Sequence, residues 1–141
     1  ILTGLGVRQL IYQVAQRPAK AFWFGNVAQG STVFALPGNP VSAFLCTLRY
    51  VLPWLDQSMQ HQPREATYAR LSQTVRYARD RTYFLQVSLR TDRQGVNRAI
   101  PVDAKGAGDL ASLADGDGFV ELPAEPSTFG TDEGFRYLGY R

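Results

Sequence analysis

The residues best suited to chemistry lie at positions 36–42, Leu-Pro-Gly-Asn-Pro-Val-Ser. Asn39 can cap a helix that begins at Pro40, because proline has no N–H to leave unpaired at the first helical position. The first N–H groups of such a helix, its dipole and the Ser42 hydroxyl would attract an anion, while Gly38 permits the tight approach of the chain. The stretch therefore predicts either a phosphate or oxyanion site or a tight strand-to-helix turn that binds nothing.

Two elements must position this turn. Residues 31–36 are rich in β-branched and apolar residues, which predicts a core strand before the turn. After it, apolar residues recur at three- and four-residue steps and predict a helix with one buried face, which Pro53 should kink or stop. The apolar positions are Val41, Phe44, Leu45, Leu48, Leu52 and Leu55. In an open α/β sheet, ligands bind at the carboxyl end of such a strand, so the Ser42 hydroxyl should point into that space.

Composition excludes several classes of protein. No apolar run reaches the roughly 18 residues of a membrane helix, and no signal-type segment opens the sequence, so a cytoplasmic protein without membrane contact is expected. The single cysteine, Cys46, lies on the apolar helix face and reads as a buried small side chain. His61 has no Cys or His neighbour, and we expect no metal site from it.

Charge is distributed unevenly. Residues 64–98 carry eight arginines against Glu65, Asp80 and Asp92, whereas residues 103–133 are acidic with Lys105 as the only base. A nucleic-acid-binding module could use the basic block. Since the arginines are spread over strand-like segments and an acidic block follows, pairing on a solvated face is the better interpretation, and no nucleic-acid partner is expected.

The pattern of elements predicts two regions. Residues 1–62 alternate helix and strand signals, with strands at 10–15, 22–24 and 31–36, and predict part of an α/β layer. A polar linker around Pro63 separates them from residues 66–141, which predict a small, mostly β domain. Its expected strands are 68–75, 83–89, 96–100, 118–122 and 135–138. The first region has too few strands to close a doubly wound sheet, so the chain reads as a fragment.

Several of these segments together resemble the molybdopterin molybdenumtransferase family, which includes the bacterial MoeA proteins and the E domain of gephyrin. The resemblance rests on Arg17-Pro18-Ala19-Lys20 before an aromatic segment, the motif at 36–42, and residues 106–112 leading into 119–123. It implies the end of the molybdopterin-binding, MogA-like three-layer α/β domain, followed by the family's β-rich C-terminal domain.

What the resemblance implies about function is specific. Such proteins are homodimers that insert molybdate into adenylylated molybdopterin with Mg²⁺ and release AMP. The metal and nucleotide contacts are expected mainly upstream of this fragment, which should not catalyse alone. The motif residues Pro37, Gly38, Asn39, Pro40 and Ser42 would contact the pterin substrate.

The resemblance also assigns roles in catalysis. Arg17 and Lys20 align with two cations of a family loop and would concentrate and orient the anionic substrates. Ser112 aligns with a serine near the molybdate. Ala19 and Ala21 replace a glycine and a proline of that loop, and Gln86 stands where an arginine is expected.

Three functions remain open from the sequence. The first is molybdenum insertion by the parent protein, through electrostatic positioning rather than a nucleophile. The second is a relative that binds pterin or acts as a scaffold but has lost transfer, which the departures at Ala21 and Gln86 favour. The third is the nucleic-acid-binding module.

Overall fold

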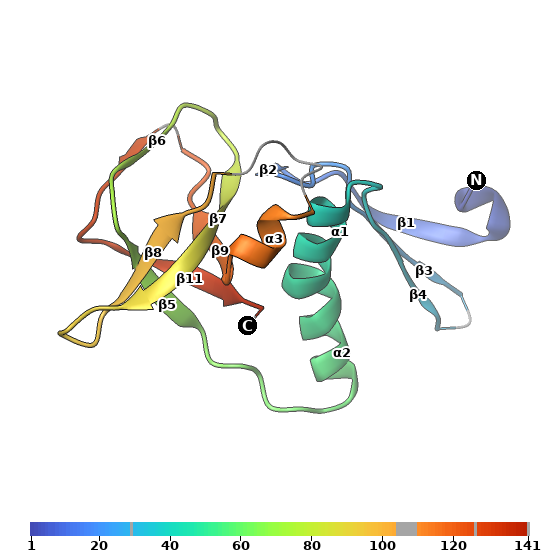
Figure 1. Cartoon of the computed structure of the whole chain (residues 1–141). Helices are drawn as coiled ribbons and strands as arrows, with labels where there is room; N and C mark the ends of the chain where they lie inside the picture. The colour runs from blue at the N-terminus through green and yellow to red at the C-terminus, as the bar shows by residue number, and fades with distance from the viewer. Residues whose placement is uncertain (29, 104–109, 126, 141) are drawn as a thin grey trace.

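The C-terminal part of the chain forms a closed β-barrel (Figure 1). The computed structural model describes residues 1–28, 30–103, 110–125 and 127–140. Within these ranges, five strands follow in the order β7-β8-β5-β11-β9, and β9 pairs again with β7, which closes the ring and leaves no open edge. The strands are β5 Thr67–Leu71, β7 Thr82–Thr91, β8 Asn97–Pro101, β9 Gly118–Leu122 and β11 Gly134–Gly139.

Four smaller elements complete the barrel. Strand β2 (Gln16–Arg17) joins the start of β7 in parallel, and β6 (Val75–Tyr77) pairs with β10 (Ser127–Phe129) as a ribbon. Helix α3 (Ser112–Asp115) precedes β9. The predicted strands of this region are confirmed, except that the segment 68–75 breaks between β5 and β6 and that β10 was not predicted.

The N-terminal part corrects the predicted α/β layer. After a 3-10 turn, η1 (Thr3–Leu5), the strands β1 (Val7–Tyr12), β3 (Trp23–Val27) and β4 (Thr32–Ala35) form an antiparallel sheet in the order β1-β3-β4. The connections between these strands are too short for the crossover that parallel strands require. The described residues are mostly β, and they form no open parallel sheet behind the turn at 36–42.

The helix after β4 runs further than predicted. It comprises α1 (Pro40–Cys46), a π-helical turn η2 (Thr47–Val51) and α2 (Leu52–Ser58) in direct succession. Pro53 therefore does not stop the helix, so of the two predicted effects, a kink or a stop, the stop is excluded. The π turn displaces the carbonyl groups that an α-turn would direct at the proline ring, so the helix accommodates Pro53 near the start of α2.

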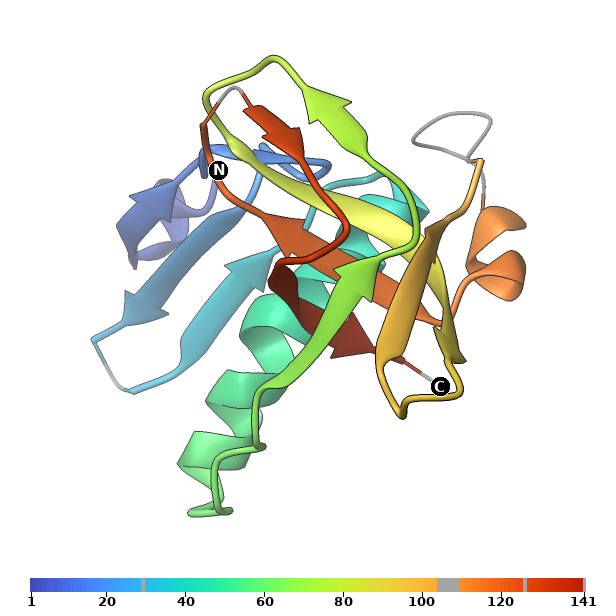
Figure 2. The ribbon, with the colours of Figure 1, turned by 90° about the vertical axis from the view of Figure 1, so that its left-hand side faces the viewer.

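Two apolar clusters hold the fold together. The first fills the barrel, where Leu71, Val87, Val120 and Leu122 are fully buried. The second lies between the helix and the outer surface of the barrel and joins residues from both sides of the linker around Pro63: Phe22, Val41, Leu45, Cys46, Phe84 and Phe119. The helix thus lies between the barrel and the sheet β1-β3-β4 (Figure 1), and in the view turned by 90° it lies behind the barrel (Figure 2).

Candidate functional site

The turn at 36–42 starts a helix as the sequence predicts. Asn39 is extended (φ −73°, ψ 124°) and its side-chain oxygen accepts a hydrogen bond from the Ser42 N–H at 3.0 Å, while Pro40 is the first helical residue. The Ala43 N–H also donates to the Asn39 carbonyl at 2.9 Å. Since Pro40 has no N–H, the cap and the first backbone bond use most donors of the first turn.

Ser42, which we expect to contact the substrate, is buried at the start of the helix. Ser42 is only 4% exposed, and the preceding residue, Val41, belongs to the cluster between helix and barrel. Leu45 and Cys46, three and four residues further along the helix, are fully buried and lie on the same side as Ser42. An anion at this turn would therefore meet the exposed Gly38 and Pro40 before it met the hydroxyl.

The loop at 16–20 is attached to the barrel by three contacts. Gln16 and Arg17 pair with Thr82 and Tyr83 at the start of β7, and the Arg17 guanidinium carbon lies 5.7 Å from the centre of the Tyr83 ring. Tyr83 in turn stacks on Tyr77, with 4.6 Å between ring centres. Such a cation–π contact restricts the guanidinium group without neutralising it.

Gln16 holds the loop from inside, and sequence reasoning missed it. It is 3% exposed, its amide nitrogen donates to the Ala19 carbonyl at 3.4 Å, and its amide oxygen accepts from the Tyr50 hydroxyl on the helix. Ala19 has φ 70°, a left-handed conformation that favours glycine. Ala19 therefore holds a conformation that a glycine would adopt at lower cost.

Arg17 and Lys20 remain available to an anion. Both residues are exposed, and among the described residues no carboxylate lies within 4.0 Å of either cation. Two such charges on one short, internally anchored loop raise the local concentration of anions.

Ser112 and Gln86 bind each other. The Ser112 hydroxyl donates to the Gln86 amide oxygen at 3.1 Å, and the Gln86 amide nitrogen donates to the Ser112 carbonyl at 2.6 Å. Both residues are buried, at 3% and 6% exposure. The hydroxyl proton is thereby directed to Gln86, so Ser112 offers an oxyanion no hydrogen in this arrangement. The partner of Ser112 could not be predicted from spacing, because it lies 26 residues away on β7.

The three predicted segments adjoin one apolar cluster. The cluster between helix and barrel contains a residue next to each predicted site residue. These are Ala19 next to Lys20, Val41 next to Ser42, and Leu113 next to Ser112. Lys105 and the glycine-rich start of the segment 106–112 lie outside the described residues. The fold thus gathers the loop, the helix start and α3 around a common support.

Metal-ligating groups are not part of this arrangement. Within the described ranges, no three His, Cys, Asp or Glu side chains come together as a metal site. Residues of the described chain thus do not fit a Mg²⁺ ion by themselves. Among the described residues, no helix is both long enough and apolar enough to span a membrane.

Comparisons with known proteins agree with the observed fold. Residues 68–133 match the family described as the MoeA C-terminal region (domain IV). A molybdopterin molybdenumtransferase from Synechocystis sp. is 37% identical over 99% of the chain, which spans 34% of that protein.

Solved structures give the same picture. The molybdopterin biosynthesis MoeA protein of Pyrococcus horikoshii superposes with a TM-score of 0.78 at 27% identity, over 98% of this chain and 33% of that one. A molybdenum cofactor biosynthesis protein of Pyrococcus furiosus has a TM-score of 0.70 at 21% identity, over 95% of this chain and 46% of that one, and supports the fold alone. The chain spans about a third of the length of the first two relatives.

Proposed function

Because the chain belongs to the molybdopterin molybdenumtransferase family, we propose that it serves molybdenum cofactor biosynthesis as part of a longer protein. That protein inserts molybdate into adenylylated molybdopterin and releases AMP. The observation that carries the proposal is the pair Arg17 and Lys20, two exposed cations without a described acidic partner on an anchored loop. Both substrates are anions, so such a loop suits them.

Catalysis by these residues would be electrostatic. Arg17 offers a planar fork of donors that matches two oxygens of an oxyanion, and Lys20 offers a compact charge. The turn formed by Pro37, Gly38, Asn39 and Pro40 would border the substrate, with Ser42 supporting it from the buried side. Ser112 enters the proposal as a positioning residue, since its hydroxyl donates to Gln86. No nucleophile is needed, because bringing two anions together and stabilising the charge lowers the barrier.

The remaining features of the proposal come from the family resemblance. The division into a pterin-binding part (1–62) and a C-terminal β domain (66–141), a homodimer, a cytoplasmic location and a requirement for Mg²⁺ all follow from it. We assign no Mg²⁺ ligand to the described residues, and the role of Arg17 and Lys20 does not depend on one.

The test uses the full-length protein that contains this chain. We expect Lys20→Ala and Arg17→Ala each to lower molybdate-dependent AMP release by about 10- to 100-fold, the value of one charge-assisted hydrogen bond in the transition state. Arg93→Ala, which removes an exposed arginine in the turn between β7 and β8, is the matched control and should leave the rate unchanged.

Two outcomes would oppose the proposal. Full activity of both loop variants would exclude the loop from the site. Wild-type protein that binds adenylylated molybdopterin but releases no AMP would instead identify a binding or scaffolding relative.

A further inference from the structure

A large cavity lies at the opposite end of the helix from the turn at 36–42. The helix packs closely on the barrel near its start, where Phe44 meets Tyr140 with 5.1 Å between ring centres. Towards Ser58 it leaves the barrel, and residues 59–66 cross back to β5 (Figure 1). The space enclosed by α2, this crossing segment and β11 measures about 760 Å³. That volume falls within the range of roughly 300–1,000 Å³ typical of small-molecule sites.

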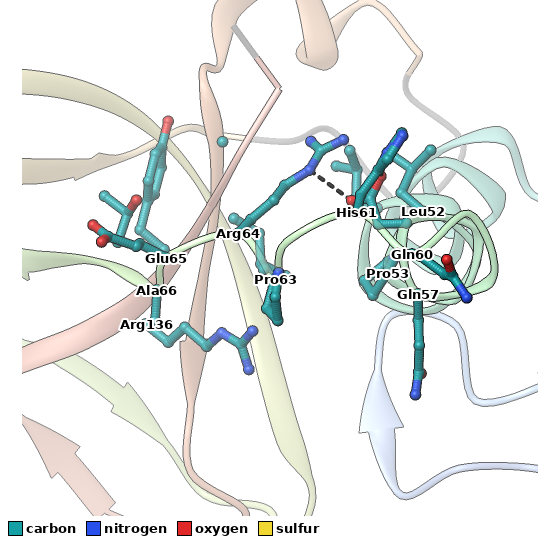
Figure 3. Close-up of a pocket in the computed structure, with 16 residues that line it drawn as sticks. Leu52, Pro53, Gln57, Gln60, His61, Pro63, Arg64, Glu65, Ala66 and Arg136 are labelled. Carbon is teal, nitrogen blue, oxygen red and sulfur yellow. Dashed lines mark hydrogen bonds and ion pairs between the residues drawn. The ribbon is translucent and has the colours of Figure 1, made fainter.

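One side of the cavity is apolar. The helix contributes Leu48, Leu52 and Pro53, the crossing segment contributes Pro63, and β11 contributes Leu138. These side chains come from three separate elements, and the pocket they form is drawn in Figure 3. An apolar molecular body could bury its surface here at roughly 25 cal/mol per Å².

The carboxylate that helix α2 contributes to the cavity, that of Asp56, is already paired with a basic side chain. Asp56 accepts a hydrogen bond from Arg64 Nε at 2.8 Å and lies 3.6 Å from His61 Nδ1. These three residues therefore contribute little net negative charge to the lining.

Arg136 is the cation left without an acidic partner. It lies on β11 and is exposed, and within the described ranges no carboxylate is within 4.0 Å of it. Figure 3 shows its guanidinium group directed towards Pro63 and the helix, whereas the carboxylate of Glu65 turns to the other side. A guanidinium group beside an apolar wall is best satisfied by an anion that carries an apolar body.

We propose that this cavity binds a small organic anion with an apolar body. Its acidic group, a carboxylate, sulfonate or phosphate ester, would pair with Arg136, and its body would pack against Leu52 and Leu138. The site shares no residue with Arg17, Lys20 or the turn at 36–42. It is therefore independent of the proposed transfer of molybdenum.

Two fluorescent probes with the same kind of aromatic body test the proposal on the full-length protein. 8-Anilinonaphthalene-1-sulfonate carries the anion, and N-phenyl-1-naphthylamine is its neutral counterpart. We expect saturable binding of the sulfonate with one site per chain. Arg136→Met should weaken it about tenfold, as loss of a charge-assisted hydrogen bond does, and leave the neutral probe unchanged.

Two further variants locate the binding. Leu52→Glu should weaken both probes, because it places a charge in the apolar wall. Arg76→Met removes another exposed strand arginine, on β6 outside the cavity, and should change neither affinity.

Three results would overturn the inference. The first is the absence of saturable sulfonate binding by the full-length protein, which includes the case in which other parts of that protein or a second copy cover the cavity. The second is an equal loss of both probes in Arg136→Met. The third is a loss in Arg76→Met as large as that in Arg136→Met. AMP release measured on the same variants should stay at the wild-type rate, which separates this site from the Arg17 and Lys20 loop.

Discussion

At the residue scale, Gln86 and Ser112 are joined by two hydrogen bonds, one in each direction. An arginine at position 86 would bring a buried charge, whereas the amide both donates to and accepts from Ser112. Removing one partner leaves buried polar groups unpaired, which costs about 1–3 kcal/mol. We expect Gln86→Leu and Ser112→Ala each to lower the free energy of unfolding by that amount.

The double variant tests whether the two residues act together. It should cost clearly less than the sum of the single variants, since the second change removes a group that the first left unpaired. Urea unfolding of the four proteins measures this. Strictly additive costs would show that the two side chains do not depend on each other.

Cys46 should make stability depend on pH in the alkaline range. Burial raises the pKa of its thiol from 9.0 to about 11. The unfolded chain loses this proton at lower pH than the folded chain, so the folded state is destabilised as pH rises between these two values. The loss should reach about 2–3 kcal/mol when the folded thiol ionises.

The measurement compares urea unfolding of wild type and Cys46→Ala at pH 8, 9 and 10. The variant carries the cost of a small cavity at every pH, but its stability should fall less steeply. Parallel curves would mean that the thiol does not contribute.

At the element scale, the strongest local prediction is the helix cap. Asn39 satisfies the Ser42 N–H, so Asn39→Ala should lower the free energy of unfolding by about 1 kcal/mol. Asn39→Asp keeps an acceptor and adds a charge that the helix dipole favours, and it should retain wild-type stability or exceed it. Thermal unfolding checks both, and equal losses in the two variants would exclude capping as the cause.

Local signals were sufficient for some elements and not for others. The cap at Asn39 and the strands β7 and β9, which are short apolar segments bounded by turn residues, are encoded within a few residues, so the sequence predicted them. The continuation of the helix through Pro53 depends on the π turn before it, which no residue pattern announces. The antiparallel arrangement of the first three strands depends on pairing between them, and alternation does not specify which strands pair.

The same reasoning applies to the candidate site. Arg17 and Lys20 could be found because charge on a loop is visible in the sequence and in the family resemblance. Gln16 and Tyr83 could not, since their roles come from contacts with the distant residues Tyr50 and Tyr77. The buried position of Ser42 was predictable in principle, because Leu45 and Cys46, three and four residues further on, share its side of the helix and are fully buried.

At the scale of the whole molecule, opposite ends of one helix border the two sites. Its start supports the turn at 36–42, and its divergent end opens the cavity beside Arg136. Halfway along, Arg49 Nη2 lies 3.3 Å from Glu121 Oε1 on β9, and both side chains are mostly buried. Within the described structure, the buried atoms Arg49 Nε and Glu121 Oε2 have no partner, so the pair is held by one contact instead of two.

This ion pair should contribute more than one at the surface. The side chains of Arg49 and Glu121 are 28% and 22% exposed, whereas Arg64, the partner of Asp56, is 73% exposed. A double-mutant cycle with Arg49→Met and Glu121→Gln should give a coupling of about 1–2 kcal/mol, against about 0–1 kcal/mol for Arg64→Met and Asp56→Asn. Because the inner pair is shielded from solvent, its coupling should also persist at 1 M salt, where the coupling of the outer pair disappears.

Urea unfolding at low and high salt measures both cycles. Equal couplings that vanish together would mean that Arg49 and Glu121 do not fix the helix to the barrel, and that the apolar cluster around Leu45 and Phe119 alone sets its orientation.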